Sequence, residues 1–204
     1  MQTTIRSKKI NKNFYKRELL LVAEELLGKI LVKKEGNKLL AGRIVEVEAY
    51  DGDTDRAAHS FGGMTKRNEV MFNEGGLLYV YMSYGVHYCC NVVTGIKGKG
   101  TAVLIRAVEP VEGIKKMIEN RFGRTLNNER EIYNLTNGPG KVCKAFDINI
   151  HDSGTELTGG KIYILDGMLK DNELIGISKR IGITKSRELP WRYFIKDNPY
   201  LSRK

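Results

Sequence analysis

The chain has 204 residues, of which 41% are hydrophobic and 28% are charged. This apolar content excludes disordered and fibrous proteins, and the length suits one folded domain with its own core. We expect a single domain over residues 1–204, with a basic N-terminal segment, residues 1–17, whose composition allows mobility. No apolar run approaches the roughly 18 residues of a membrane span, and no signal-peptide core follows the basic segment. We therefore expect a soluble protein without membrane contact, cytoplasmic and nucleoid-associated in a bacterium or nuclear in a eukaryote.

The formal net charge is +10, from 34 lysine and arginine residues against 24 aspartate and glutamate residues. Such a balance favours polyanionic partners, nucleic acid first, although a basic surface with no special role fits the charge equally well. The three cysteines, Cys89, Cys90 and Cys143, form no CxxC pair, so neither a disulfide framework nor a zinc site is indicated. We expect reduced, buried cysteines, no metal and no cofactor.

The first part of the chain is typical of a helix followed by two strands. Apolar residues recur at helical spacing over residues 18–27, and Gly28 ends that helix. Residues 29–34 then form a strand, residues 35–37 a turn, and residues 38–50 the return strand. These elements are expected to support the fold.

Within the return strand, residues 43–50 alternate strictly, which predicts a half-buried strand with Val45, Val47 and Ala49 toward the core. The other face would carry an apolar residue, two carboxylates and an aromatic ring: Ile44, Glu46, Glu48 and Tyr50. On its own such a row is common on surface strands. The acidic run that follows, residues 51–55, lacks the glycine and the terminal glutamate of a calcium loop, so we expect no calcium site.

A β-hairpin is predicted from two short strands, residues 78–82 and 87–92, joined through Ser83-Tyr84-Gly85-Val86. Turn tips are usually small and polar, so the ring of Tyr84 exposes apolar area unless it meets a partner. In a basic protein such a ring can enter a base stack as a wedge. The alternative is that Tyr84 folds back onto its own sheet.

The rest of the chain adds helices and strands that complete a mixed α+β fold. A short apolar strand over residues 102–107 carries Arg106 near its end, and a buried arginine needs an anionic partner. Residues 110–122 and 141–146 predict helices, with a loop or loose helix at 124–134. Three more strands complete the sheet: residues 161–165, 174–181 and 191–195.

Several uncommon short segments occur in order over most of the chain: Glu48-Ala49-Tyr50, Ala57-Ala58-His59-Ser60, Arg67-Asn68, Met71-Phe72, Leu78-Tyr79-Val80-Tyr81, Tyr84-Gly85, Asn91, Arg106-Ala107-Val108-Glu109-Pro110 and Asn137-Gly138-Pro139. Together they resemble the alkyladenine (3-methyladenine) DNA glycosylase family. The resemblance implies a single mixed α+β domain with a curved antiparallel sheet, flanking helices and a protruding β-hairpin that inserts into the DNA minor groove. That agrees with the hairpin predicted from the strands alone.

The resemblance implies catalytic roles at matched positions. Glu48 matches the carboxylate that deprotonates the attacking water, and Arg106 matches a residue that helps to hold this water and would pair with Glu48. Ile183 matches a residue that offers the water a backbone carbonyl. Glu46 has no matched catalytic role and is expected to support the structure.

The same resemblance implies a pocket for one extruded base. Tyr50 and Tyr81 match two rings that sandwich the base, an arrangement that suits electron-poor, often cationic purines. His59 matches a residue that stacks or donates a hydrogen bond. Asn91 matches a floor residue that disfavours the exocyclic amine of guanine.

Contacts with DNA are implied for the hairpin tip and its surroundings. Tyr84 matches the wedge that fills the gap left by the extruded nucleotide. Further DNA-binding residues are expected at Arg67, Met71, Val86, His87 and Lys141. The helix at Lys141 follows a glycine-rich turn without Walker spacing, so its amides would at most contact a phosphate. The chain departs from the family pattern at His87, at the short turn 63–65 and in the acidic run 51–55.

The sequence therefore predicts a monofunctional DNA glycosylase of base excision repair, acting as a monomer on double-stranded DNA. It would flip alkylated or deaminated purines of the 3-methyladenine, 7-methylguanine, hypoxanthine and ethenoadenine class and leave an abasic site. One rival is a non-enzymatic minor-groove binding module in which Glu48 is incidental. Another is a glycosidase with Glu46 and Glu48 as paired carboxylates, but side chains at i and i+2 of a strand point the same way rather than flanking a bond.

Overall fold

The computed structural model describes residues 7–36, 38–126 and 128–203. The strands of the described chain are β1 Ile30–Glu35, β2 Lys38–Tyr50, β3 Leu78–Ser83, β4 His87–Thr94, β5 Thr101–Glu112, β6 Ile162–Leu165, β7 Ile175–Ser178 and β8 Arg192–Ile195. The α-helices are α1 Lys12–Tyr15, α2 Leu19–Glu25, α3 Ile114–Phe122 and α4 Pro139–Ala145. Short 3₁₀ helices lie at η1 Glu69–Phe72, η2 Glu129–Asn134 and η3 Ile150–Asp152. Across these described ranges, no helix has both the length and the apolar character needed to cross a membrane.

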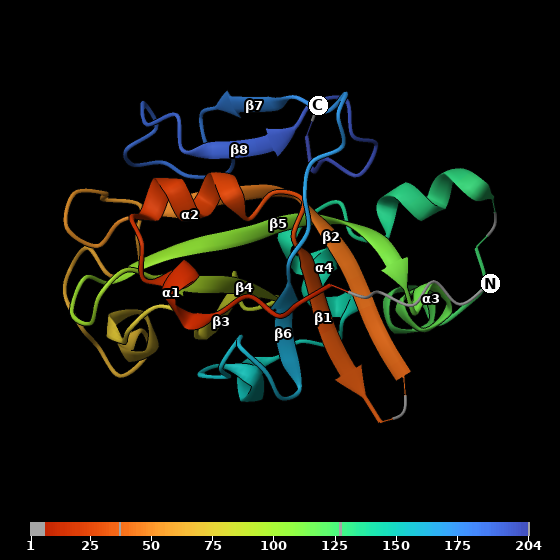
Figure 1. Ribbon diagram of the computed structural model, residues 1–204, viewed down its shortest axis with the longest axis horizontal. Helices are drawn as coiled ribbons and strands as arrows, with labels where there is room; N and C mark the ends of the chain where they lie inside the picture. The colour runs from red at the N-terminus through yellow and green to blue at the C-terminus, as the bar shows by residue number, and fades with distance from the viewer. Residues whose placement is uncertain (1–6, 37, 127, 204) are drawn as a thin grey trace.

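The strands form one eight-stranded sheet in the order β3-β4-β5-β2-β1-β6, with β8 paired to both β2 and β7. Neighbouring strands run antiparallel throughout. The sheet curls strongly, and α2 crosses over β2 and β5 while α3 and α4 lie on the far side (Figure 1). The predicted α+β architecture with a curved antiparallel sheet is confirmed.

Strand β2 is the centre of this sheet because three strands pair with it. Its first part pairs with β1, residues 46–48 pair with β8, and β5 runs along it from Ala41 to Tyr50. The prediction of a half-buried strand is wrong, because residues 40–49 are buried on both faces. On the face that carries the carboxylates, Glu46 is contacted by Arg192 of β8, which pairs beside β2, and by Ser202 of the C-terminal segment.

The main core contains the other face of β2, as predicted. It includes Val45, Val47 and Ala49 together with residues of α2 and α4, and each of these three side chains is 0% exposed. The N-terminal segment contributes as well: α1 lies within residues 1–17, and Tyr15 is buried in the core. Residues 1–6 of that segment lie outside the described residues.

Strand β5 and helix α3 have different bounds from those predicted. The strand continues through Pro110, which lies opposite Gly42 next to a register shift, and proline is tolerated at such an irregularity. Gly113, with φ +74°, then turns the chain into α3. Helix α4 begins at Pro139 rather than Lys141, because proline suits the first turn of a helix.

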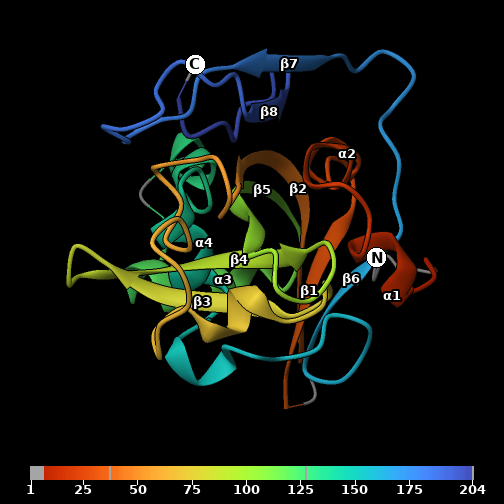
Figure 2. The ribbon, with the colours of Figure 1, turned by 90° about the vertical axis from the view of Figure 1, so that its left-hand side faces the viewer.

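The predicted hairpin is present as the antiparallel pair β3 and β4, with Ser83 opposite His87 at its end. Its turn has positive φ at Tyr84 (+51°) and Gly85 (+69°), and the Val86 amide donates to the Ser83 carbonyl at 3.1 Å. This is the geometry of a type I′ turn. The tip extends beyond the rest of the ribbon in Figure 2, and the side chain of Tyr84 is 89% exposed. Tyr84 therefore does not fold back onto its own sheet.

Candidate active site

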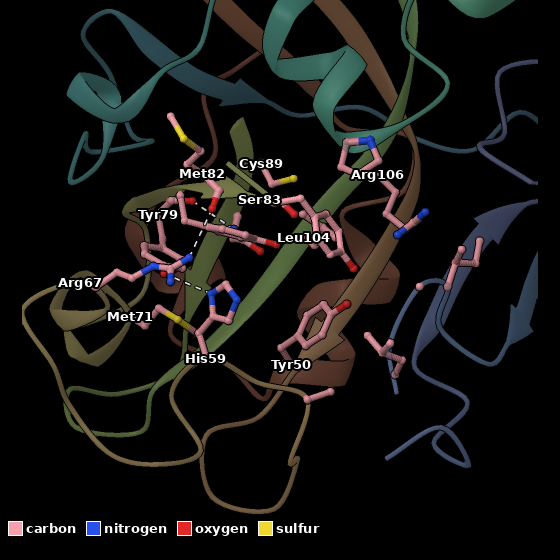
Figure 3. A pocket seen from close by; sticks show the side chains of 18 residues that line it. Tyr50, His59, Arg67, Met71, Tyr79, Met82, Ser83, Cys89, Leu104 and Arg106 are labelled. Atoms are coloured by element: carbon pink, nitrogen blue, oxygen red, sulfur yellow. Dashed lines mark hydrogen bonds between the residues drawn. The ribbon is translucent and has the colours of Figure 1, made fainter. Parts of the chain in front are cut away.

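A pocket of about 470 Å³ lies between the end of β2, the hairpin and residues 181–183 (Figure 3). This volume suits a small-molecule site, for which roughly 300–1,000 Å³ is usual. The lining contains many of the residues predicted from the sequence, brought together from distant parts of the chain: Tyr50, His59, Arg67, Met71, Tyr81, Tyr84, Asn91, Arg106 and Ile183. The structure thus assembles most of the predicted site in one place.

Glu48 lies directly behind this lining and is 0% exposed. Its Oε2 accepts hydrogen bonds from the Tyr50 hydroxyl at 2.8 Å and from Nη1 of Arg106 at 3.2 Å, while Oε1 accepts one from the Ile181 amide at 2.7 Å. These donors satisfy carboxyl oxygens that burial has removed from water. Tyr50 and Arg106 both line the pocket, so two of the three groups that bond Glu48 belong to the pocket wall.

The two side chains that bond Oε2 both have raised pKa values. Burial, followed by the charge of Glu48, raises the pKa of Tyr50 well above its ordinary value. Burial opposes the charge of Arg106, but the carboxylates of Glu48 and Glu46 outweigh it and raise the pKa of the guanidinium. At neutral pH Tyr50 is therefore a neutral donor and Arg106 a permanent cation.

Glu46, two residues before Glu48, is equally buried but has different partners. It accepts hydrogen bonds from Nε of Arg192 at 2.7 Å, from the amide and hydroxyl of Ser202 at 2.6 and 2.7 Å, and from Nε of Arg106 at 3.3 Å. Arg106 thus bridges the two carboxylates. These contacts favour the predicted supporting role of Glu46.

The far wall of the pocket is an aromatic cluster on β3 and the 55–60 loop. The ring of His59 meets Tyr81 edge-on with centroids 4.3 Å apart, and its Nδ1 lies 3.3 Å from the Tyr79 hydroxyl. Tyr79 in turn stacks on Tyr81 at 5.7 Å. Partial burial, and then the nearby charge of Arg67, lower the pKa of His59. At neutral pH His59 is therefore an uncharged ring at the rim of the pocket.

Strand β4 supplies the base of the pocket. Asn91 is 5% exposed and donates from Nδ2 to the Tyr79 carbonyl at 3.1 Å, which holds its amide in one orientation. Cys89 also lines the pocket, and burial raises the pKa of its thiol to about 11. All three cysteines are free and buried, as predicted. In the part of the chain that is described, no group of three or more His, Cys, Asp or Glu side chains could hold a metal ion.

The residues predicted to bind DNA divide into exposed and buried ones. Tyr84 and Val86 are exposed at the hairpin tip, at 89% and 72%. Arg67 is exposed beside the pocket, and its guanidinium donates to the Met82 carbonyl at 3.3 Å. Met71 is 3% exposed and lies in the pocket lining, so its side chain offers almost no surface to DNA.

The two remaining residues, His87 and Lys141, are not among the residues that line the pocket. His87 is exposed and stands next to Gly140 of α4, at a second cavity of about 320 Å³. Lys141 is half-buried and donates to Oδ1 of Asn137 at 2.6 Å. That bond stabilises the turn before α4 and directs the ammonium group toward the protein.

Sequence reasoning missed several residues around Glu48. The donor at Ile181 is a backbone amide, so the residue type does not indicate its role. Arg180 and Asp55 form an ion pair between residues 125 positions apart in the sequence. Asp55 belongs to the acidic run 51–55, for which the sequence excluded a calcium loop and suggested no other role. The sequence of that run does not indicate that Asp55 is fully buried. Tyr79 could be recognised only as part of the motif on β3.

The described site has a buried carboxylate behind a pocket lined by aromatic rings, and the basic molecule carries an exposed tyrosine at a hairpin tip. These features are those expected of the class of enzymes that hydrolyse the bond between a nucleic-acid base and its sugar. Comparison with known proteins gives the particular family. The model of the family described as Methylpurine-DNA glycosylase (MPG) matches residues 13–199. The chain therefore belongs to the methylpurine-DNA glycosylase family, and it is a DNA N-glycosylase.

Three relatives illustrate this similarity, and each bears the name "Putative 3-methyladenine DNA glycosylase". They come from Desulfitobacterium hafniense, Clostridium novyi and Carboxydothermus hydrogenoformans, and are 44%, 46% and 47% identical to this chain. The alignments cover 97%, 97% and 95% of this chain and 100%, 100% and 98% of the relatives. The similarity thus extends over the whole length of both partners.

Proposed function

We propose that this protein excises alkylated or deaminated purines, of the 3-methyladenine, 7-methylguanine, hypoxanthine and ethenoadenine class, from double-stranded DNA. The observation that carries the proposal is the position of Glu48 directly behind a pocket walled by Tyr50 and Tyr81. A flipped base between these rings gains stacking energy, and a cationic base gains cation–π attraction as well. Asn91 at the base of the pocket would disfavour an ordinary guanine.

The reaction is hydrolysis of the N-glycosidic bond. Glu48 removes a proton from a water molecule that attacks the anomeric carbon, and Arg106 and the Ile183 carbonyl help to hold that water. The Tyr50 hydroxyl already donates a hydrogen bond to Oε2. The water therefore either approaches Oε2 beside this hydroxyl or passes its proton to Oε2 by way of the hydroxyl. The electrons of the broken bond go to the base. A cationic purine leaves as a neutral molecule, whereas a neutral purine such as hypoxanthine leaves as an anion that takes up a proton from solvent. No lysine attacks the sugar, so the product is an abasic site in an intact strand.

The protein would act as a monomer that approaches DNA from the minor groove. Tyr84 supports this mode because it is 89% exposed at the hairpin tip and also lines the rim of the pocket. Its ring can fill the gap left by the flipped nucleotide. The net charge of +10 favours binding to the phosphate backbone.

Two rival functions are weaker. Family membership sets aside a non-enzymatic binding module. A glycosidase with paired carboxylates would need Glu46 as a free group, but its oxygens accept hydrogen bonds from Arg192, Ser202 and Arg106.

The first test is Glu48→Gln on duplexes that contain one 7-methylguanine or one hypoxanthine. Loss of the general base should lower the single-turnover rate of base release by about a hundredfold or more. Free base is measured by chromatography, and strand breaks should appear only after alkali treatment. Glu25→Gln, which removes a carboxylate from a surface pair with Arg17, is the matched control and should keep the wild-type rate. A Glu48→Gln rate within a few-fold of this control would contradict the assignment.

A further inference from the structure

Arg180 and Asp55 form an ion pair beside the active site that the mechanism above does not use. Both side chains are 0% exposed. Nη2 of Arg180 donates to Oδ1 of Asp55 at 2.8 Å, and Nη1 donates to Oδ2, so the contact is bidentate. Neither side chain belongs to the described lining of the pocket. The pair therefore acts on the site only through its neighbours.

This pair joins three segments that build the pocket. Arg180 also donates to the Ala49 carbonyl at 2.9 Å, at the end of β2, and to the Ser186 carbonyl at 3.2 Å. Asp55 accepts a hydrogen bond from the Ala57 amide at 2.9 Å, two residues before His59. The end of β2, the 55–59 loop and the 180–186 segment thus meet at one guanidinium group.

Arg180 also contacts one wall of the pocket and precedes a residue that bonds Glu48. Its Cζ lies 4.6 Å from the centroid of the Tyr50 ring, which lines the pocket, and 5.4 Å from that of Trp191. The next residue along the chain is Ile181, whose amide donates to Glu48 at 2.7 Å. Any displacement of Arg180 would therefore move one wall of the pocket and one donor to the general base together.

Stability alone does not account for a charged pair at this position. Uncharged side chains of similar volume are often as stable as a buried ion pair, or more stable. Nε of Arg180 is moreover buried without a hydrogen-bond partner among the described atoms, which adds a further cost. A planar, forked cation is what the three joined segments and the Tyr50 ring require, and lysine cannot reproduce it.

We propose that Arg180 and Asp55 are positioning residues for base excision, which hold the Tyr50 ring and the Ile181 amide in the geometry that Glu48 needs. This inference rests on the proposed function of the pocket. It predicts that the pair affects the rate of base release more than the binding of DNA.

The test compares two double variants of the full chain with the wild-type protein. Arg180→Met with Asp55→Asn removes both charges, leaves no unpaired ion, and keeps an acceptor for the Ala57 amide. Arg43→Met with Glu173→Gln is the matched control, because Arg43 on β2 also makes a bidentate pair with a distant carboxylate, outside the pocket. The probes are duplexes with a single 7-methylguanine or hypoxanthine, and a duplex with an abasic-site analogue.

We expect the Arg180/Asp55 variant to release base at least about tenfold more slowly than the control in single turnover, since small misplacements of catalytic groups have effects of this size. Binding to the abasic-site duplex should stay within about threefold, because the hairpin is unchanged. Trp191 is the single tryptophan of the chain, and its fluorescence should change in this variant alone.

A rate equal to that of the control would overturn the inference. If the double variant does not fold, as judged by circular dichroism, Arg180→Lys decides instead: a tenfold or greater loss of rate supports the pair's role, and a wild-type rate overturns it. If the wild-type protein releases neither base, the proposed function itself is contradicted. If the wild-type protein releases base and the variants do so at the same rate, only the role of the Arg180–Asp55 pair is contradicted.

Discussion

At the scale of the residue, Glu48 illustrates how the oxygens of a fully buried carboxylate can all find hydrogen-bond donors inside a protein. Its donors come from three places: Tyr50 of the same strand, Arg106 of β5, and Ile181 of the segment before β8. Each satisfies part of the charge that water would otherwise solvate. In the proposed reaction, these bonds hold the carboxylate in place while it takes a proton from water.

At Tyr84, on the hairpin tip, the backbone conformation that stability favours conflicts with the proposed role of the ring as a wedge. Its φ of +51° lies in the left-handed region, which a bulky side chain rarely adopts. We expect Tyr84→Asn to raise the free energy of unfolding by up to about 1 kcal/mol, because asparagine tolerates this conformation better. The same change should weaken binding to abasic-site DNA, since the wedge is lost.

Urea unfolding and fluorescence anisotropy with labelled DNA measure the two effects of this substitution. Tyr84→Phe is the control, because it keeps both the ring and the backbone strain and should match the wild type in both measurements. If Tyr84→Asn bound abasic-site DNA as tightly as Tyr84→Phe does, the ring would have no role as a wedge.

At the scale of the element, strand β2 separates two carboxylates that look equivalent in the sequence. The register between β2 and β5 shifts on both sides of Glu46, so that Val45 and then Arg106 have no directly opposite residue. Such bulges redirect side chains and are common near active sites. Arg106 can therefore reach both carboxylates. Of these two carboxylates, Ser202 and Arg192 bond Glu46 and not Glu48.

This arrangement makes Glu46 important for the stability of β2 and its neighbours. Glu46→Gln would leave two buried arginines without part of their countercharge, and we expect it to lower the free energy of unfolding by about 3–5 kcal/mol. Guanidinium unfolding followed by circular dichroism measures the change. Glu25→Gln, at a surface pair, should cost no more than about 1 kcal/mol. If Glu46→Gln also lowered the free energy of unfolding by no more than about 1 kcal/mol, the hydrogen bonds of Glu46 with Arg106, Arg192 and Ser202 would contribute little to stability.

At the scale of the whole molecule, ion pairs connect segments that are far apart in sequence and make the fold sensitive to acid. Hydrogen bonds from Arg43 lower the pKa of Glu173 below its ordinary 4.5. Burial opposes the charge of Asp152, but hydrogen bonds from the Asn149 backbone and from Lys161 lower its pKa below 3.8. Below these ordinary values the unfolded chain binds more protons than the folded one, so stability falls as pH falls.

We therefore expect the melting temperature to change little from neutral pH down to 4.5, the ordinary pKa of Glu173, and to fall steeply below it. Glu173→Gln should be less stable than the wild type at neutral pH, and the difference should shrink as the pH drops through the lowered pKa. Thermal melts followed by circular dichroism measure both curves. A difference that stayed constant down to about pH 3 would show that the carboxylate charge is not its source.

Much of the fold was predictable from local patterns. The strands, the hairpin and α2 follow from side-chain periods and turn residues, which act over a few positions. Helix and strand ends were less predictable, as Pro110 shows: its place in β5 depends on a register shift against Gly42 of another strand. The resemblance of the motifs to a known family identified half of the pocket lining, including Tyr50 and Tyr81.

The sequence by itself determined that Glu48 and Tyr50 share one face of a strand, because side chains alternate with a period of two residues. It also determined that Tyr84 occupies the tip of a hairpin. Only the tertiary structure decided that this strand is buried on both faces, that Ile181 donates to Glu48, and that Arg180 and Asp55 join the walls of the pocket. These contacts link residues more than a hundred positions apart, and no local pattern encodes such a pairing, because it depends on how the whole sheet curls.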